Sequence, residues 1–330
     1  MTTPRFDIDP YLNDPTRWAT SMAHHADLMV PCLDAVSARS IIEVGAYAGD
    51  LTRLLVDWAA AAGARVAAID PSPQEALERL ADDREELELI RRTSFDALPD
   101  VELADVVVID GDHNYFTVTR ELELIEQRAA GGGLPLLLFH DVCWPHARRD
   151  DYFAPEDIPA ESRQLIAGDG GGLFPGDHGL RKDGVPYPKS AAREGGPRNG
   201  VLTAVEDFVD ARDDLRLVVV PAFFGFGVLW SRSAPWAAEV EAIVGPWDRH
   251  PLLERLEANR VHHLAQAHAP QVRVWELQNR EASYRQLLER MLGSSAFAVA
   301  ERLSRLRVRA GVATAQSVIS KDEIRRVLGR

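Results

Sequence analysis

Short apolar runs alternate with helical patterns between residues 39 and 141, and this alternation restricts the fold more than any other feature of the sequence. A strand, a helix and a second strand in succession form a β-α-β unit, whose two strands lie parallel in one sheet. The runs are apolar at nearly every position, so we expect helices to cover both faces of the sheet. The predicted strands are SIIEVG (40–45), RVAAID (65–70), LELIRR (87–92), DVVVID (105–110) and LPLLLFHD (134–141), with helices near 51–62, 74–81 and 115–130.

The segment LRLVVVPAFFGFGVLW (215–230) breaks this alternation, because a short glycine-containing link joins its two apolar runs. The link leaves no room for a crossover helix, so the two runs predict an antiparallel hairpin. An amphipathic helix is expected just before it, over residues 200–212. The predicted fold class is therefore a doubly wound α/β fold with a seven-stranded, mostly parallel sheet.

The chain is longer than one compact domain usually is, so additions to this sheet domain are expected. We expect an N-terminal helical cap over 1–37 with one helix from Thr16 to Met29, the sheet domain over 38–232, and a helical C-terminal extension over 233–330. Pro270 and Gly293 divide the helical pattern of the extension, which argues against a long continuous coiled coil. Its predicted role is packing or homo-oligomer formation.

Residues 142–199 are rich in Gly, Pro, Asp and Arg and lie directly after a predicted strand. A long irregular insertion of this kind is a functional lid or a disordered loop, and its place in the sequence favours the lid. Its aromatic and imidazole side chains are expected either to form the walls of an acceptor pocket or to pack the insertion on the sheet. They are Trp144, His146, Tyr152, Phe153 and Tyr187.

Composition excludes several classes of function. The formal net charge of −14 argues against nucleic-acid binding, which needs concentrated positive charge. The arginine-rich tail over 301–330 is interpreted as a solvated amphipathic helix. Cys32 and Cys143 form no metal-binding or disulfide pattern. The sequence has neither the roughly 18 consecutive apolar residues of a spanning helix nor a secretory signal pattern, so a cytoplasmic protein without a membrane partner is expected.

The stretch IIEVGAYAGDLT (41–52) places one glycine at the end of the first predicted strand and a second just before the helix that follows it. Such glycines let the backbone approach a ligand closely, and the start of the helix offers unpaired N–H groups. The spacing is E-x-G-x-x-x-G, from Glu43 through Gly45 to Gly49, and not the G-x-G-x-x-G of dinucleotide sites. An NAD-dependent dehydrogenase is therefore disfavoured.

Together with the order of the other elements, this pattern resembles class I S-adenosylmethionine-dependent methyltransferases, across roughly residues 38–232. The resemblance implies a Rossmann-like sheet of seven strands whose last strand is antiparallel, and S-adenosylmethionine as cofactor. It places the methionine part against the glycine-rich turn, the ribose at an acid that ends the second strand, and the adenine after the third strand. The implied cofactor residues are Glu43, Gly45, Ala46, Tyr47, Gly49, Asp70, Pro71, Ser94, Phe95 and Asp110.

Polar side chains also follow the fourth and fifth predicted strands. Asp110, Asp112 and His113 follow one, and His140 and Asp141 follow the other. Adjacent strands lie roughly 5 Å apart, so these side chains can converge on one ion. Oxygen and imidazole donors without thiolate suit Mg²⁺ or Mn²⁺. The alternative is ordinary turn and capping chemistry.

The motifs IDGDH (109–113) and HDV (140–142) narrow the resemblance to small-molecule O-methyltransferases, the group of catechol O-methyltransferase and the metal-dependent sugar O-methyltransferases of antibiotic pathways. The resemblance implies a metal at Asp110, His140 and Asp141, with His113 as the base that deprotonates the acceptor hydroxyl. Imidazole stands here in place of the lysine of the catechol enzyme, and His140 stands in place of a carboxylate. The implied acceptor is a sugar or phenol of natural-product or glycan metabolism.

Two other functions stay open at this point. The same enzyme could work without metal, with Asp110 and Asp141 holding the acceptor by hydrogen bonds. The chain could instead be a cofactor-binding scaffold that recruits a partner enzyme through its C-terminal helices.

Overall fold

The computed structural model describes residues 6–12, 21–168, 171–210, 212–312, 314 and 319–328, without the side chains of 269–276 and 279. Internal contacts divide the chain into two compact units, Met1–Gln266 and Ala267–Arg330. This division falls later than the boundary expected at residue 232, because helix α8 (Ala237–Val244) packs beside α2 (Ala26–Val36) in the first unit. Its side chains Val240 and Val244 are fully buried there.

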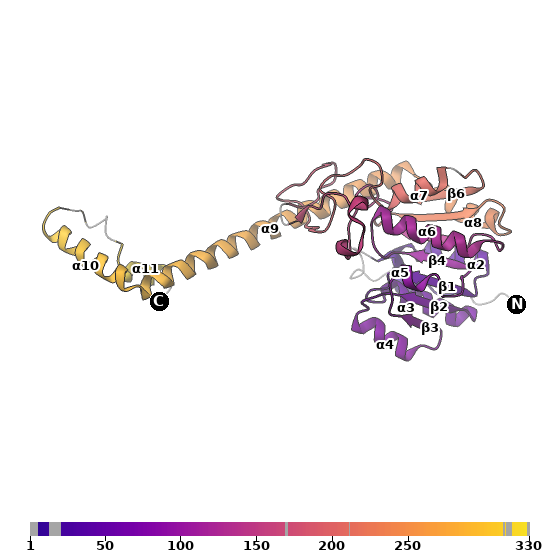
Figure 1. Ribbon diagram of the computed structural model, residues 1–330, viewed down its shortest axis with the longest axis horizontal. Coiled ribbons are helices and arrows are strands. Elements are labelled where there is room, and N and C mark those ends of the chain that lie inside the picture. Colours follow the sequence, from indigo (N-terminus) through magenta and orange to yellow (C-terminus); the bar gives the residue numbers. More distant parts are fainter. Residues whose placement is uncertain are drawn as a thin grey trace. The chain divides into compact units, whose positions relative to one another are not determined.

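The first unit is built on one seven-stranded sheet with the order β3-β2-β1-β4-β5-β7-β6 (Figure 1). The strands are β1 Ser40–Val44, β2 Arg65–Ile69, β3 Leu87–Ile90, β4 Val106–Ile109, β5 Leu136–His140, β6 Leu215–Val220 and β7 Phe226–Ser231. Strands β1 to β5 pair in parallel, whereas β7 is antiparallel to both β5 and β6. The predicted fold and the predicted hairpin are confirmed. Strand order reverses between β1 and β4, which is where ligands collect in such sheets.

Helices cover both faces of the sheet, as the apolar strands require. The core on one face includes Leu33 of α2, Leu54 of α3 and Val240 of α8, and the core on the other includes Leu122 of α6 and Val205 of α7. The helices of the sheet domain are α3 Asp50–Ala62, α4 Glu75–Asp83, α5 Ser94–Ala97, α6 Tyr115–Ala129 and α7 Val201–Asp210, each close to its predicted place where one was predicted.

The N-terminal segment differs from its predicted form. A short helix α1 covers Asp9–Leu12, and a 3₁₀ turn η2 (Met22–His25) leads into α2. The predicted helix from Thr16 to Met29 therefore ends too early, and its first residues lie outside the described part of the chain. Helix α2 continues because Leu33 buries its side chain in the core, and it ends where Ser37 takes a left-handed conformation with φ 54°.

The described part of the insertion, 142–168 and 171–199, has a defined fold without an α-helix. It contains the 3₁₀ turns η3 (Pro155–Asp157) and η4 (Ala160–Ser162) and isolated strand-like bridges such as Asp151 with Ser190. Arg149, 1% exposed, donates hydrogen bonds to the carbonyls of Ala191 and His178 at 2.7 and 3.1 Å. These buried bonds hold the insertion together in place of a large apolar core.

The C-terminal region is helical, as predicted, with α9 Pro251–Gly293, α10 Ser295–Arg309 and α11 Lys321–Val327. The expected interruption at Pro270 is wrong, because α9 runs through it for 43 residues. A proline removes one backbone donor, and the bonds on either side keep the helix continuous. Gly293 does end the helix, and Ser294 caps α10 by accepting a hydrogen bond from the Phe297 N–H.

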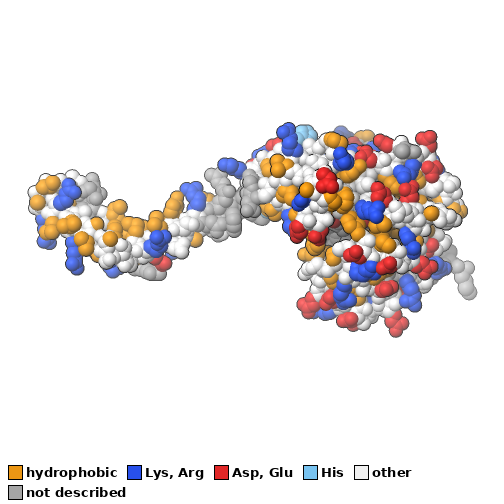
Figure 2. Space-filling model, in the orientation of Figure 1, with side chains coloured by type: hydrophobic (Ala, Val, Ile, Leu, Met, Phe, Trp, Pro, Cys, Tyr) orange, Lys and Arg blue, Asp and Glu red, His pale blue; other side chains and the backbone are white. Residues whose placement is uncertain are grey.

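Apolar side chains are exposed on the second unit (Figure 2). On α10, Val299, Leu303 and Leu306 are each more than half exposed and recur at helical spacing, so they share one face. Such an apolar stripe is typical of a surface that packs against another protein. Within the described part of the chain, no helix is long and apolar enough to span a membrane.

Candidate active site

A cavity of about 770 Å³ opens at the carboxyl ends of β1, β2, β4 and β5. It brings together nearly all of the side chains that the sequence motifs single out. Those that line it are Glu43, Gly45, Ala46, Tyr47, Asp70, Pro71, Ser94, Phe95, Asp110, His113, His140 and Asp141. Gly49 is absent from the lining.

The two glycines of the turn after β1 have different tasks. Gly45 has φ +86°, and a Cβ atom there would lie 2.2 Å from the carbonyl oxygen of Asp110 and 2.3 Å from Cα of Gly111. The end of β4 therefore leaves no room for a side chain. Gly49, at φ +84°, precedes α3 and donates its N–H to the carbonyl of Ala46 at 2.8 Å. It forms the turn that carries the cavity wall, and the prediction that it lines the cofactor is not supported by its position.

Asp70 lies at the end of β2 with its carboxylate fixed on both sides. Oδ2 accepts the backbone N–H of Tyr47, and Oδ1 accepts that of Ser72, each at 2.7 Å. These two bonds tie the turn after β1 to the turn after β2. A carboxylate oxygen can accept more than one bond, so the group still has acceptor capacity for the two hydroxyls of a diol.

Glu43, in β1, is 1% exposed. Burial is the main cause that raises its carboxyl pKa to about 8; the charges of Asp110 and Asp70 add to this, and the Thr52 hydroxyl opposes it. No well-formed hydrogen bond reaches its Oε2 from the described residues. A buried polar atom of this kind at a cavity wall is suited to a ligand, because an unmade hydrogen bond is costly in the interior.

Ser94 and Phe95 belong to α5, where Thr93 caps the helix by accepting the N–H of Asp96. Phe95 packs edge-on against Phe116 with ring centroids 6.1 Å apart. Glu121 of α6, 1% exposed, joins them in the cavity wall. Burial is the main cause that raises its carboxyl pKa to about 8, with the Ser94 hydroxyl opposing the shift.

Glu121 was not among the site residues predicted from the sequence. A signal existed, since the spacing of Val118, Leu122 and Ile125 places Glu121 on the buried face of α6.

The ends of β4 and β5 hold a compact cluster of charged side chains. Ligand atoms of Asp110, His140 and Asp141 all lie within 4.8 Å of one another. His140 Nδ1 is 3.1 Å from Asp110 Oδ1 and 3.3 Å from Asp141 Oδ2. His113 Nε2 is 3.0 Å from Asp141 Oδ2 and 3.6 Å from Asp110 Oδ1. All four predicted residues therefore converge.

The surroundings of His140 test whether this cluster suits a cation. Its Nε2 lies 3.1 Å from the carbonyl oxygen of Phe223, and because a carbonyl only accepts, Nε2 carries the hydrogen. In the neutral tautomer Nδ1 then turns its lone pair toward the carboxylates of Asp110 and Asp141. Positive charge is needed among these groups, as a proton or as a metal ion. A histidine whose second nitrogen donates to a backbone carbonyl is the usual arrangement of a metal ligand.

The charges of this cluster act on both imidazoles. Burial alone would lower the pKa of His140, but Asp110 and Asp141 raise it well above its usual value. Burial likewise opposes the charge on His113, and Asp141 and Asp110 raise its pKa well above the usual value. Asp112 stands apart from this cluster. It accepts the N–H of Phe153 at 2.8 Å and the hydroxyl of Thr117 at 3.0 Å, so it organises the loop and fulfils the turn alternative.

A comparison with protein-family models indicates the class of domain that carries this site. Residues 42–142 match a family model described as a methyltransferase domain. The chain contains a methyltransferase domain. The matched residues run from β1 to just past β5, so they include both the glycine turn and the charged cluster. The class I sheet expected from the motifs is the sheet observed.

Three solved structures named as methyltransferases are similar to this chain in fold. The SAH-bound Podospora anserina methyltransferase PaMTH1 is 16% identical, with a TM-score of 0.41 over 66% of this chain and 82% of that one. A Staphylococcus aureus protein assigned as a caffeoyl-CoA O-methyltransferase is 11% identical, with a TM-score of 0.40 over 66% of this chain and 87% of that one. The O-methyltransferase TomG from Streptomyces achromogenes is 16% identical, with a TM-score of 0.39 over 65% and 82%. Among curated proteins, none matches this chain.

The insertion completes the cavity of the methyltransferase domain. His146, Phe153 and Tyr187 line it, whereas Trp144 and Tyr152 do not. Tyr152 is buried and donates its hydroxyl to Asp150 Oδ2 at 2.8 Å, which is the packing role considered for it. Lining residues that the sequence analysis missed come from the N-terminal cap, from α6 and from the insertion. They include Ser21, Met22, Thr117, Glu121, Asp151, Asp157 and Ile158.

Proposed function

We propose that this protein is an S-adenosylmethionine-dependent O-methyltransferase that methylates a hydroxyl of a small molecule, with His113 as general base and a divalent cation at Asp110, His140 and Asp141. The observation that carries the proposal is that the glycine turn after β1 and the charged cluster after β4 and β5 open into one cavity. A methyl donor and a deprotonated acceptor can therefore meet inside it. Proximity of this kind supplies much of the rate enhancement of a two-substrate reaction.

The donor half of the cavity is assigned to the turns after β1, β2 and β3. Asp70 accepts hydrogen bonds from the ribose hydroxyls, with its carboxylate already oriented by Tyr47 and Ser72. Ser94 and Phe95 flank the adenine. Gly45 allows the methionine part to approach the backbone where any side chain would collide with β4. The carboxylate of Asp110 suits a ligand with a cationic sulfur, and the buried Glu43 carboxyl offers its unpaired Oε2 for a hydrogen bond.

The acceptor half is assigned to the charged cluster. Asp110, His140 and Asp141 would hold a divalent cation, which when bound would lower the pKa of an acceptor hydroxyl. Asp110 and Asp141 supply oxygen ligands, and His140 supplies a nitrogen ligand whose other ring nitrogen is fixed on the Phe223 carbonyl. A mixed oxygen and imidazole set suits Mn²⁺ better than Mg²⁺, which prefers oxygen alone.

His113 is the residue placed to take the hydroxyl proton. It follows β4 and is partly exposed to the cavity, and its Nε2 lies 3.0 Å from Asp141. A base must reach the proton within about 2.6–3.2 Å or through one water molecule. From its place beside Asp141, His113 would be within reach of an acceptor hydroxyl held at this cluster.

The acceptor is proposed to be a sugar or a phenol, as in natural-product or glycan metabolism. The rings of Phe153, Tyr187 and Phe224 line the cavity beside the charged cluster. Apolar walls with a few polar groups are typical of sites for ring-shaped ligands. The insertion 142–199 is proposed to act as the lid over this acceptor.

The experiment has two arms that do not need the acceptor. S-adenosylhomocysteine is titrated into the metal-stripped protein by calorimetry, and Mn²⁺ is titrated separately. We expect saturable heat in both arms, with Asp141→Asn weakening Mn²⁺ binding at least tenfold while S-adenosylhomocysteine still binds. His178→Ala is the control, because His178 lies exposed in the insertion. Absence of nucleoside binding by the folded protein would refute the proposed function.

Once an acceptor is found, chelation separates the metal-dependent reaction from the metal-independent one. Loss of methyl transfer after chelation, with recovery on addition of Mn²⁺, supports the cation. A full rate without metal favours the alternative in which the two aspartates hold the acceptor by hydrogen bonds.

The second unit is proposed to mediate homo-oligomer formation through the apolar stripe of Val299, Leu303 and Leu306. Light scattering of the full chain should give a mass above that of the monomer. Leu303→Glu should lower that mass. A monomer in both cases would contradict this role and leave recruitment of a partner enzyme as the remaining use of the stripe.

A further inference from the structure

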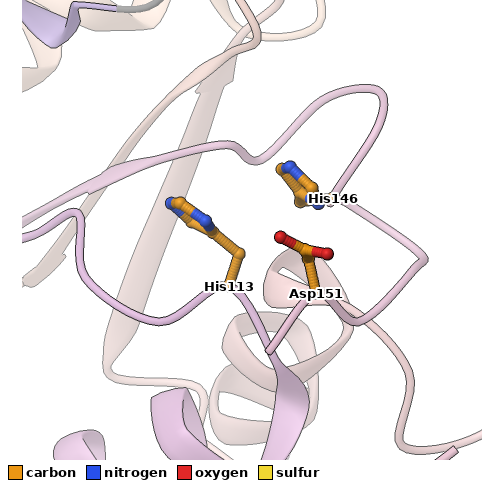
Figure 3. A group of neighbouring side chains, drawn as sticks. All are labelled: His113, His146 and Asp151. Carbon is orange, nitrogen blue, oxygen red and sulfur yellow. The ribbon is translucent and has the colours of Figure 1, made fainter. Parts of the chain in front are cut away.

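A second group of metal-ligating side chains lies beside the first. One ligand atom each from His113, His146 and Asp151 lie within 4.8 Å of one another. Figure 3 shows these two imidazoles and the carboxylate as neighbouring side chains. His146 and Asp151 come from the insertion, and only His113 is shared with the cluster proposed for the reaction.

The backbone holds this group together. The N–H of Asp151 donates to the carbonyl of His113 at 2.9 Å, which joins the insertion to the loop after β4. The hydroxyl of Ser190 donates to Asp151 Oδ1 at 2.7 Å and so orients the carboxylate, leaving Oδ2 to bind a cation. The three side chains are therefore positioned before any ligand arrives.

The side chain of His146 is buried with one ring nitrogen that has no hydrogen-bond partner among the described residues. It is 4% exposed, with the ring stacked on His113 at 4.9 Å and edge-on to Tyr187 at 5.2 Å. That nitrogen is Nδ1, which is itself buried. Leaving such a group unmet costs about 1–3 kcal/mol, so a buried unpaired nitrogen needs an explanation. A bound metal ion provides one.

We propose that His113, His146 and Asp151 form a separate site for a borderline transition-metal ion such as Zn²⁺. Two imidazoles and one carboxylate, with a fourth position open, are a common zinc ligand set. Co²⁺ and Ni²⁺ take the same donors. Tetrahedral zinc with bonds of about 2.0–2.1 Å needs ligand atoms roughly 3.3 Å apart, which small side-chain rotations achieve from the present separations.

Occupation of this site ties the insertion to the end of β4 and withdraws His113 from proton transfer. Zn²⁺ is then an inhibitor of the methyl transfer, and the insertion is locked over the cavity. This consequence rests on the proposed role of His113, whereas the metal site itself does not.

The test is a Co²⁺ titration of the metal-stripped full chain, followed by visible absorption and by counting bound ions. Both clusters have ligands for Co²⁺, so the wild type should bind two ions. His146→Gln and Asp151→Asn should each remove one, with affinity for that ion falling more than about 100-fold, beyond the loss caused by an outer-shell partner. Asp141→Asn should remove the other ion. His178→Ala, in the same insertion, should bind two.

Several results would overturn the site. The first is that His146→Gln and Asp151→Asn both retain two ions. The second is that the wild type binds a single ion, which is lost only in Asp141→Asn. The others are loss of all binding in every ligand variant, which would mean one shared centre, and no binding by the wild type. A single ion lost in His146→Gln and Asp151→Asn but kept in Asp141→Asn would support this site and contradict the metal of the proposed reaction. Thermal unfolding of each variant confirms that it is folded.

Discussion

Substitution of Gly45 by alanine tests the physical reason for the turn after β1. The new Cβ would stand 2.2 Å from the Asp110 carbonyl oxygen and 2.3 Å from Cα of Gly111, both of them backbone atoms. Neither strand can shift freely. The N–H of Gly45 donates to the carbonyl of Ile69, and the N–H of Asp110 donates to the carbonyl of Val44, each at 2.9 Å.

The expected loss of stability has three parts. A left-handed conformation costs an L-residue about 1–2 kcal/mol. Overpacking against rigid neighbours adds typically 1–3 kcal/mol. Weakening one or two backbone hydrogen bonds adds about 0.5–1.5 kcal/mol each. Together these give roughly 2.5–8 kcal/mol for Gly45→Ala, a large fraction of the 5–15 kcal/mol that stabilises a typical protein.

Gly63→Ala is the matched control, because Gly63 also has a positive φ, +68°, but its Cβ would meet only Arg39 Nη1 at 3.7 Å. It should lose only the conformational part, about 1–2 kcal/mol. Urea unfolding monitored by tryptophan fluorescence compares the two variants with the wild type. Calorimetry should also show that Gly45→Ala no longer binds S-adenosylhomocysteine while Gly63→Ala does. Equal stability losses in the two variants would refute the steric argument.

Three further substitutions probe the cavity wall and the link that supports it. Asp70→Asn replaces one acceptor oxygen by a donor facing a backbone N–H, so the affinity for S-adenosylhomocysteine should fall at least about tenfold, or 1.4 kcal/mol. Asp82→Asn, at an exposed position of α4, is the control. Unchanged affinity in Asp70→Asn would show that Asp70 does not bind the ribose. Burial raises the carboxyl pKa of Glu121 from its ordinary value of 4.5 to about 8, so the folded protein binds this proton more tightly than the unfolded chain does. The free energy of unfolding of the wild type should therefore fall relative to that of Glu121→Gln as pH rises from about 4.5 to 8. The slope should reach up to about 1.4 kcal/mol per pH unit. A stability difference that does not depend on pH in urea unfolding would contradict this shift. Glu257→Gln replaces the carboxylate that accepts the N–H groups of Phe223 and Phe224 in the β6–β7 link. Mn²⁺ affinity should fall about 10–100-fold while nucleoside binding stays intact. Glu254→Gln is the control and should change neither affinity.

The sheet could be predicted from the sequence because its strands carry their own signal. Each parallel strand is buried on both faces, so it appears as a short, nearly continuous apolar run, and the helix between two strands sets their direction. The link at residues 221–225 is too short for a helix, so it could only join antiparallel strands. Most strands were predicted one or two residues too long, because the predicted runs included the first residues of the following turns, such as Asp70, Asp110 and Asp141.

The charged cluster could be predicted for a related reason. Carboxyl ends of adjacent parallel strands meet at one edge, so Asp110 and His140 had to lie near each other once β4 and β5 were placed side by side. His146 and Asp151 could not be found in this way. They belong to an irregular insertion held by hydrogen bonds such as those of Arg149, and no periodicity in the sequence specifies which of its residues turn inward.

The first turns of α9 show how far the site depends on residues outside the motifs. The sequence assigns Glu257 to an extension beyond the sheet domain, yet its carboxylate accepts the N–H groups of Phe223 and Phe224 at 3.1 and 2.8 Å. Both phenylalanines have positive φ, 47° and 69°, which costs energy unless the surroundings hold them. The strained link presents the Phe223 carbonyl to Nε2 of His140 and thereby fixes the tautomer that leaves Nδ1 facing the carboxylates. Arg260 in turn holds Glu257 through two bonds of 2.7 Å. The cluster that resembles a metal site is therefore completed by a helix that carries none of its ligands.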